Sequence, residues 1–423
     1  MLEPTTPDGV RAEVRAWLAG TWDPDRPLGE WRAALADSGW GCPTWPLEWY
    51  GRGLTAELGR VVADELRTAG AVGPAVGVGM SLAAPTILAH GSDELKGRLL
   101  RPIATGEDTW CQLFSEPGNG SDLAGLTTRA THDGDEFVVE GQKVWTTGAQ
   151  HAAYGMLLAR TDWDAPKHKG ITFFALPMRQ SAIDVRPLRQ MNGRASFNEV
   201  FITEAKVPAS NIVGELHGGW TVALTTLAHE RGLAAGLLGG LPPGGGGRTR
   251  DEAMAEVSAY LKTYEWYPQR AGRADLVSVR AAATGLAHDP VTRQMVAHLT
   301  ATERASRWTA DRAAASRRAG RPPGAEGSIG KLTASLIARE AAAAHTTLAG
   351  AAGMLTGPDS PEHGIVAEVL VSVPGASIAG GTDEVQHNII GERVLGLPRE
   401  PSVDADVPFR EVMVNRRRAR EVR

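Results

Sequence analysis

The stretch from Trp110 to Ala149, WCQLFSEPGNGSDLAGLTTRATHDGDEFVVEGQKVWTTGA, differs in pattern from the sequence on either side of it. It contains a loop rich in Gly and Ser, followed by the alternating run EFVVEG (136–141), which is typical of a β-strand. The dipeptide Asp133-Gly134 before that run is favoured in β-hairpin turns. The surrounding sequence has mostly helical periodicity. We therefore predict a compact β domain inserted between two helical parts.

The flanking sequence divides the chain into four parts. Apolar residues at helical spacing predict an N-terminal all-helical domain over residues 1–107. Short apolar runs bounded by Gly, Pro and Asn predict a middle β domain over 108–217. Long Ala-rich amphipathic segments predict a C-terminal helical bundle over 218–400, broken by a flexible LPPGGGG segment at 241–247. A tail follows at 401–423, and the predicted fold class is α+β.

Composition excludes several classes of protein. The 423 residues carry a formal charge of −5, which gives no general attraction to nucleic acid, and the basic end RRRAREVR is interpreted as a solvated end. Cys42 and Cys111 are the only cysteines, which excludes a disulfide framework and argues against a Cys-based metal site. No secretory signal is visible, and no run approaches the ~18 apolar residues of a membrane span. We therefore expect a soluble cytoplasmic protein.

Four segments together resemble the acyl-CoA dehydrogenase family of flavoproteins over about residues 10–400. They are SEPGNGSDLAGLTTRA (115–130), EGQKVWTTGA (140–149), SFNEVFITEAKVPASNIVGE (196–215) and SIAGGTDEVQHNIIGERVLGLP (377–398). The resemblance implies an N-terminal helical domain, a central β-barrel-like domain and a C-terminal four-helix bundle. It also implies FAD as cofactor, an acyl-CoA thioester as substrate and an electron-transfer flavoprotein or similar acceptor. A homo- or hetero-oligomer is implied because the family shares FAD between subunits.

Two of these segments are expected to face the flavin. Gly118 and Gly120 leave backbone N–H groups open to a ligand, and the Trp145 ring offers a flat apolar face. A lone loop of this kind is more often a surface turn, and a lone Trp is more often a core residue. By the resemblance, the flavin-contacting positions are Leu113, Phe114, Ser115, Gly120, Ser121, Trp145, Thr146 and Thr147. Ser121 is also expected near the CoA portion of the substrate.

The implied reaction is α,β-desaturation of an acyl-CoA thioester, which needs a base for the Cα proton while the Cβ hydrogen leaves as hydride to flavin N5. Many family members carry this base as the Glu of a Tyr-Glu-Gly-Thr step. This chain has Gly380 at that place, within Ala379-Gly380-Gly381-Thr382, and glycine cannot act as a base. The isovaleryl- and long-chain branches place the Glu on an earlier helix, where Glu230 of LAHERGLAAG matches. We predict Glu230 as the base and Arg231 as a substrate-binding neighbour.

The periodicity of that helix agrees with a charged pair near an apolar face. From Gly219, one apolar stripe is formed by Trp220, Ala223, Leu224, Leu227, Ala234 and Leu238. Glu230 lies on its flank and Arg231 in its middle. Charged residues in an apolar stripe are costly unless they are paired or used in chemistry. The alternative interpretation is therefore a buried Glu–Arg pair that holds helices together.

The adenine end of the FAD site matches the family less well. Arg280 is the nearest counterpart of an Arg that reaches the FAD of a neighbouring subunit, although the Phe that accompanies it is missing. Thr382 and Glu384 match positions near the adenine part, and the backbone of Gly380 and Gly381 is a candidate donor to the thioester oxygen. Three scattered histidines, His298, His345 and His387, are interpreted as surface or satisfied core residues, and no metal site is predicted.

Two alternatives to a dehydrogenase stay open. The first is a non-catalytic or half-site partner subunit of a heteromeric acyl-CoA dehydrogenase, which the missing motif Glu and the altered adenine-end residues favour. The second is a flavin-dependent oxidase or monooxygenase on the same fold. Because enzymes of that second kind often lack a carboxylate base, Glu230 argues against it. The sequence does not identify the acyl chain.

Overall fold

The computed structural model describes residues 6–236, 246–319, 324–402 and 404–412. The chain forms two compact units. The first comprises residues 1–188, 196–263 and 403–423, and the second comprises 189–195 and 264–402. The two helices that follow residue 218 are grouped in the first unit, with the helical and β parts before them.

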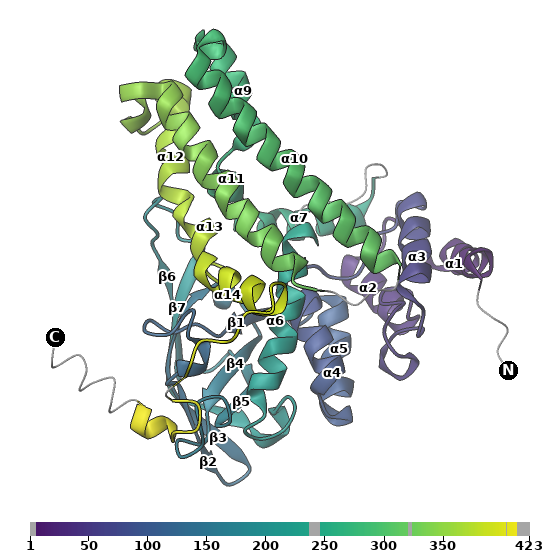
Figure 1. Cartoon of the computed structure of the whole chain (residues 1–423). Helices are drawn as coiled ribbons and strands as arrows, with labels where there is room; N and C mark the ends of the chain where they lie inside the picture. The colour runs from purple at the N-terminus through teal and green to yellow at the C-terminus, as the bar shows by residue number, and fades with distance from the viewer. Residues whose placement is uncertain (1–5, 237–245, 320–323, 403, 413–423) are drawn as a thin grey trace. The chain divides into compact units, whose positions relative to one another are not determined.

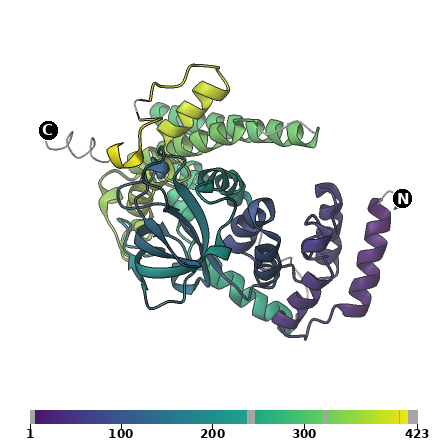
Figure 2. The same cartoon turned by 90° about the horizontal axis from the view of Figure 1, so that it is seen from below.

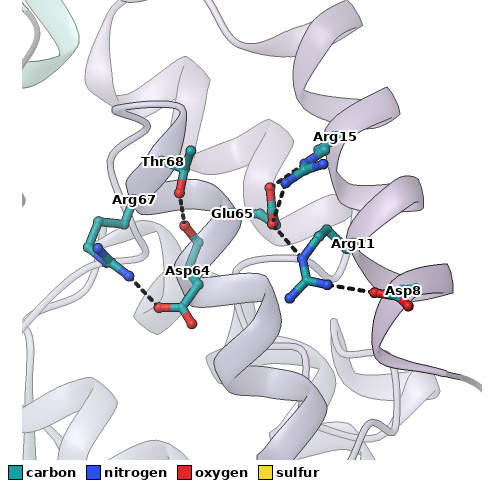
Figure 3. Close-up of polar contacts among 7 residues, drawn as sticks. All are labelled: Asp8, Arg11, Arg15, Asp64, Glu65, Arg67 and Thr68. Atoms are coloured by element: carbon teal, nitrogen blue, oxygen red, sulfur yellow. Dashed lines mark hydrogen bonds and ion pairs between the residues drawn. The ribbon is translucent and has the colours of Figure 1, made fainter.

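Five helices form the N-terminal part of the first unit (Figures 1 and 2). They are α1 (Pro7–Thr21), α2 (Leu28–Asp37), α3 (Ala56–Thr68), α4 (Ala84–His90) and α5 (Asp93–Thr105). The side chains of Thr6, Thr55 and Ser92 accept hydrogen bonds from the first turns of α1, α3 and α5, so each helix begins at a polar cap. A buried carboxylate, Glu65 of α3, lies between two arginines of α1 and ties these helices together (Figure 3).

The middle of the first unit is a curled seven-stranded sheet with the order β1-β4-β2-β3-β7-β6, in which β5 pairs with β4. Its strands are β1 (Trp110–Leu113), β2 (Arg129–Asp133), β3 (Glu136–Thr146), β4 (Tyr154–Arg160), β5 (Ile171–Pro177), β6 (Ile183–Leu188) and β7 (Phe197–Pro208). The predicted strand at 136–141 and the turn before it are confirmed, with Gly134 at φ 65°. All pairings are antiparallel except those of β4 with β1 and β2.

The sheet has two apolar faces, because side chains alternate along each strand. One core lies among the strands and includes Cys111, Leu113 and Phe174. The other lies between the sheet and the helices and includes Trp110 and Phe114. Both ends of β1 therefore contribute to both cores, and the strand is fixed from two sides.

Two further helices belong to the first unit: α6 (Gly219–Gly236), which packs on β5 and α4, and α7 (Arg248–Lys262), which packs on α2 (Figure 1). The predicted apolar stripe of α6 is partly wrong, since Leu224 is 51% exposed. Between Trp220 and Glu230, the described part of the helix after Gly219, the buried residues are Val222, Ala223 and Thr226. Thr226 is tolerated there because its hydroxyl bonds that of Thr86 at 3.0 Å, which a count of apolar residues cannot foresee.

The first unit also includes a segment near the C-terminus. Residues 404–412 lie against the β domain, where the N–H of Phe409 donates to the carbonyl of Ala165 at 3.1 Å and that of Arg410 to Trp163 at 3.1 Å. Phe409 is fully buried, and the guanidinium of Arg160 lies 3.4 Å from its ring centroid. The basic end 416–423 and most of the LPPGGGG segment lie outside the described residues.

The second unit is helical. Its helices are α8 (Tyr267–Arg270), α9 (Ala274–Ala283), α10 (Pro290–Arg318), α11 (Glu326–Ala349), α12 (Ile365–Ser372), α13 (Pro374–Ile378) and α14 (Asp383–Arg393). The long helices α10 and α11 lie side by side (Figure 1). The α+β fold class, with helical N- and C-terminal parts and a curled sheet in the middle of the sequence, is thus confirmed.

One described stretch, Pro361–Arg393, is long and apolar enough to cross a membrane by length and composition alone, with a mean hydropathy of 1.5. Core helices of globular proteins meet the same criterion. In the structure the stretch is divided among α12, α13 and α14 by Pro374 and by Gly380-Gly381, both glycines having positive φ.

Candidate active site

A buried ion pair closes the neck of the Gly-rich loop. The ammonium of Lys143 lies 2.9 Å from the carboxylate of Glu116, and the two side chains are 0% and 4% exposed. The same carboxylate accepts hydrogen bonds from the N–H groups of Thr127 and Thr128 at 2.7 and 2.8 Å. Burial alone would raise the pKa of Glu116, but Lys143 and these hydrogen bonds outweigh it and lower that pKa to about 2. Burial lowers the pKa of Lys143.

This pair connects the loop to β3. Lys143 also donates to the carbonyl of Phe114 at 3.1 Å, and the N–H of Val144 donates to the carbonyl of Ser115 at 2.9 Å. Leu113 and Phe114 are buried in the core, so only their backbone remains for a ligand. Ser115 is half-buried beside them. The predicted positions 113–115 are therefore brought against the strand that carries Trp145.

The tip of the loop is open. Gly120 and Ser121 are exposed, and a Cβ added at Gly118 or Gly120 would meet no protein atom within 4 Å. The backbones of Glu116 and Asn119 exchange two hydrogen bonds of 3.0 Å, which hold the tip in a tight turn. Its backbone groups can therefore be approached closely by a ligand.

Trp145 lies at a β-bulge, where the pairing of β3 with β7 shifts between Lys143 and Thr146. Its φ is 61°, in the left-handed region that a bulky residue rarely adopts, and 55% of the residue is exposed. The ring contacts Phe197 edge to face, with centroids 5.8 Å apart. A strained bulge that presents an aromatic ring outward is a feature typical of ligand sites.

Thr146 and Thr147 follow this bulge. Thr146 is buried, and its hydroxyl has no hydrogen-bond partner among the described residues. Its carbonyl accepts a hydrogen bond from Asn198 at 2.9 Å, while Thr147 is half-buried. An exposed ring next to an unpartnered buried hydroxyl fits a flat ligand with polar edges, as the isoalloxazine ring of a flavin is.

The structure brings Glu230 to β1, the strand that leads into Ser115. The carboxylate, on half-buried Glu230 of α6, accepts a hydrogen bond of 3.1 Å from the amide of Gln112 in β1. Gln112 precedes Ser115 by three residues. The predicted base and the predicted flavin-facing strand thus meet within the first unit. The side chain of Arg231 lies outside the described residues.

The other predicted positions lie in the second unit, at the start of α14. Thr382 caps this helix by accepting from the N–H of Val385 at 3.3 Å. Glu384 is exposed, and hydrogen bonds from its own N–H and from the Thr382 hydroxyl lower its pKa. Gly380 and Gly381 have φ of 69° and 84°, and their carbonyls accept from the amide of Gln386 at 3.0 and 3.3 Å.

Arg280 does not present a free guanidinium. It is 6% exposed, donates to Glu362 at 2.9 Å and bonds Nδ1 of His345 at 2.7 Å. His345 in turn bonds the carbonyl of Arg273 at 3.0 Å, so it is a satisfied core histidine as predicted. In this conformation Arg280 is held by its own unit, which gives no support for the predicted contact with a cofactor.

Sequence reasoning missed Gln112 and the Glu116–Lys143 pair. Gln112 could have been noticed as a polar residue between Trp110 and Phe114 on one face of a strand. The ion pair had no comparable signal, because its partners are 27 residues apart. Among the described residues, no group of three or more His, Cys, Asp or Glu side chains could hold a metal ion.

Three models of the acyl-CoA dehydrogenase family match the chain: the N-terminal domain at residues 4–107, the middle domain at 111–204 and the C-terminal domain at 273–395. The acyl-CoA dehydrogenase FadE34 of Mycobacterium tuberculosis is 36% identical over 392 residues, covering 92% of this chain. The chain spans 49% of the length of that relative. The acyl-CoA dehydrogenase IpdE1 of the same organism is 33% identical, covering 92% of this chain and 97% of its own length.

Among solved structures, "Tcur3481-Tcur3483 steroid ACAD" superposes with a TM-score of 0.63 at 29% identity, covering 94% of this chain and 99% of its own. The ChsE4-ChsE5 complex from Mycobacterium tuberculosis gives a TM-score of 0.56 at 28% identity, covering 95% and 100%. The chain belongs to the acyl-CoA dehydrogenase family and is therefore an oxidoreductase by family. Members of this family generally use FAD.

Proposed function

We propose that this protein is an FAD-dependent acyl-CoA dehydrogenase in which Glu230 is the base. The observation that supports this is the hydrogen bond of 3.1 Å between Gln112 of β1 and the Glu230 carboxylate. It brings a half-buried carboxylate to the strand that leads into Ser115. FAD, when bound, accepts the hydride from the substrate Cβ. Glu230 takes the proton from Cα, because a carboxylate positioned within reach of that proton can act as a general base.

The remaining assignments are proposals of the same kind. In the first unit, the backbone of residues 113–115, the Trp145 ring and the hydroxyls of Thr146 and Thr147 would hold the flavin ring. Gly120 and Ser121 would lie where the flavin approaches the substrate. In the second unit, the backbone of Gly380 and Gly381 would donate to the thioester oxygen, and Thr382 and Glu384 would lie near the adenine part of FAD. Arg231 would contact the substrate, and Arg280 would contact the cofactor only after its guanidinium leaves Glu362 and His345.

The test is the spectrum of the purified protein during anaerobic addition of acyl-CoA thioesters. We expect a flavin absorbance band that bleaches in the wild type. In Glu230→Gln we expect the band to remain and the bleaching rate to fall by at least about 10³-fold, because the proton has no acceptor. Full activity in Glu230→Gln would refute the assignment of the base. Reoxidation by O₂ with an oxygenated product would favour an oxidase or monooxygenase instead.

A second candidate is a half-site subunit of a heteromeric acyl-CoA dehydrogenase. It is favoured by Arg280, whose guanidinium is bound to Glu362 and His345. Purification without bound flavin, together with activity that appears only after a second chain is added, would support this candidate. A homo-oligomer with full flavin occupancy would oppose it.

We further propose a bulky, steroid-type acyl-CoA as a first substrate to assay, beside straight and branched chains. The proposal rests on similarity to the steroid ACAD structure at 29% identity. The proposed acceptor is an electron-transfer flavoprotein or a similar carrier. A cytoplasmic location is proposed because Cys42 and Cys111 are free and buried, with pKa values raised by burial to about 12.

A further inference from the structure

Gln112 occupies an unusual position in its strand. It lies between Trp110 and Phe114 on the face of β1 that packs against the helices, and both aromatic neighbours are 5% exposed. Its partner in the parallel pairing with β4 is Met156, which is 1% exposed. An amide at such a half-buried position costs free energy unless it is hydrogen-bonded. The amide of Gln112 therefore requires a hydrogen-bond partner at this position in β1.

That partner is the carboxylate of Glu230, at 3.1 Å from the Gln112 amide nitrogen. The contact joins residues 118 positions apart, on a strand and on a helix. Because β1 is anchored on both faces by core residues, Gln112 presents its amide from a rigid element. A carboxylate on a long side chain has several rotamers, and a hydrogen bond from a rigid donor selects one of them.

We propose that Gln112 is a positioning residue for the base: its amide holds the Glu230 carboxylate in the orientation that meets the substrate Cα–H. This inference rests on the proposed function of Glu230. In the step itself, the Cα–H bond breaks and its proton passes to the Glu230 carboxylate. The electron pair of that bond forms the new C=C bond, while the Cβ hydrogen leaves with two electrons as hydride to the flavin.

An amide suits this task better than the alternatives. A Lys or Arg at residue 112 would hold the carboxylate in its ionised form by charge and weaken it as a base. An apolar residue would leave one carboxylate oxygen without a donor at a half-buried site. Gln112 supplies one neutral donor, does not titrate and leaves the carboxylate able to take a proton.

If the Gln112–Glu230 hydrogen bond only stabilised the packing of α6 on β1, substitution of Gln112 would have a different effect from the loss of a positioning residue. Loss of a tie lowers stability, while loss of orientation lowers the rate of the proton-transfer step. Gln112→Met keeps the size of the side chain without its donor. Gln112→Glu is nearly isosteric, and its carboxylate repels that of Glu230. Gln142→Met is the matched control, since Gln142 of β3 makes an amide-to-carboxylate bond of 3.2 Å to Glu199 of β7.

The experiment measures kcat, KM, flavin absorbance, melting temperature and the isotope effect with substrate deuterated at Cα. We expect Gln112→Met and Gln112→Glu to lose about 10- to 100-fold in kcat, because a small misplacement of a catalytic group has that effect. KM and flavin content stay near wild type, and the isotope effect rises as proton transfer becomes slower. Gln142→Met keeps wild-type kcat and isotope effect.

The two proposals fail in different ways. An inactive wild type, or an active Glu230→Gln, removes the proposed function. With those two behaving as expected, wild-type kcat and isotope effect in both Gln112 variants would overturn the positioning role alone. A fall in melting temperature of Gln112→Met without a change in the isotope effect would likewise assign Gln112 to structure only.

Discussion

Lys143 and Glu116 show how a charged pair can be buried without being left unsatisfied. Glu116 accepts from Lys143, Thr127 and Thr128, and Lys143 also donates to the carbonyl of Phe114. Desolvation of two charges is expensive, and only such a complete set of partners offsets it. The pair therefore fixes the neck of the loop that leads to Ser121.

The lowered pKa of Glu116 gives a pH dependence with a definite sign. A carboxyl whose folded pKa is about 2, against an ordinary 4.5, stabilises the fold above pH 4.5. This contribution is lost as the pH falls from about 4.5 toward 2. We expect acid unfolding, followed by circular dichroism, to be steep in this window in the wild type and shallower in Glu116→Gln.

At neutral pH the same variant tests the pair directly. Glu116→Gln leaves the Lys143 ammonium buried without an anion, and we expect a loss of about 3–5 kcal/mol. The double variant Glu116→Gln with Lys143→Met should recover part of that loss, because no charge remains buried. Equal stability of the single variant and the wild type would show that the pair does not hold the loop.

At the scale of single elements, Glu65 of α3 is the contact that joins α1 to α3. Arg15 donates to it at 2.7 Å and Arg11 at 3.0 Å, and the three side chains point toward one another (Figure 3). On the same helix, Asp64 and Arg67 form an exposed pair at 2.6 Å. The two pairs differ in burial, since the Glu65 side chain is 7% exposed and that of Asp64 is 63% exposed.

We expect Glu65→Gln to lower the free energy of unfolding by about 1–3 kcal/mol, because it leaves hydrogen-bonding groups of α1 poorly paired. Asp64→Asn is the control and should change stability by no more than about 1 kcal/mol, as exposed ion pairs do. Hydrogen bonds from Arg15 and then from Arg11 outweigh burial and lower the pKa of Glu65. The stability difference between the wild type and Glu65→Gln should therefore disappear in acid, where Glu65 is protonated. Equal effects of the two substitutions in thermal unfolding would contradict the role of burial.

The elements differ in how far their sequence could predict them. The strand at 136–141 was predictable from alternation, but β3 continues to Thr146, past the bulge that turns Trp145 outward. Helix α6 was predictable as a helix, but its buried face includes Thr226 and excludes Leu224. Both differences come from long-range contacts, with β7 and with Thr86, and local patterns contain no information on them.

For the whole molecule, the order of helical and β parts followed from the spacing of apolar residues, and the family followed from four separate motifs. The resemblance to that family selected Glu230 and residues 113–115, and the fold brings Glu230 to Gln112, which directly precedes residues 113–115. Arg280 was only the nearest counterpart of the family's Arg, and its contacts with Glu362 and His345 were not predictable because they depend on the packing of the second unit.

The return of the chain to the β domain near its C-terminus is a feature of the whole molecule that no motif indicated. Phe409 covers Arg160, whose guanidinium donates to the carbonyls of Ala124, Leu126 and Lys167 at 2.7, 3.3 and 3.2 Å. Two of these carbonyls lie in the segment that directly follows Ser121. Burial lowers the pKa of Arg160 to about 10, against the raising effect of nearby carboxylates, so Arg160 stays charged at neutral pH.

We expect Phe409→Ala to lower the free energy of unfolding of the first unit by about 3–5 kcal/mol, because a fully buried ring is removed from a packed site. Water would then reach Arg160 and compete for its bonds to the backbone at 124 and 126. Loosening of this segment should displace Ser121, which we propose to lie near the CoA portion of the substrate. We therefore expect the KM for acyl-CoA to rise while flavin content stays near wild type. Phe409→Leu keeps a large apolar side chain over Arg160. Its stability and its KM should therefore stay close to those of the wild type. Unchanged stability and KM in Phe409→Ala would show that the C-terminal segment has no part in holding the loop.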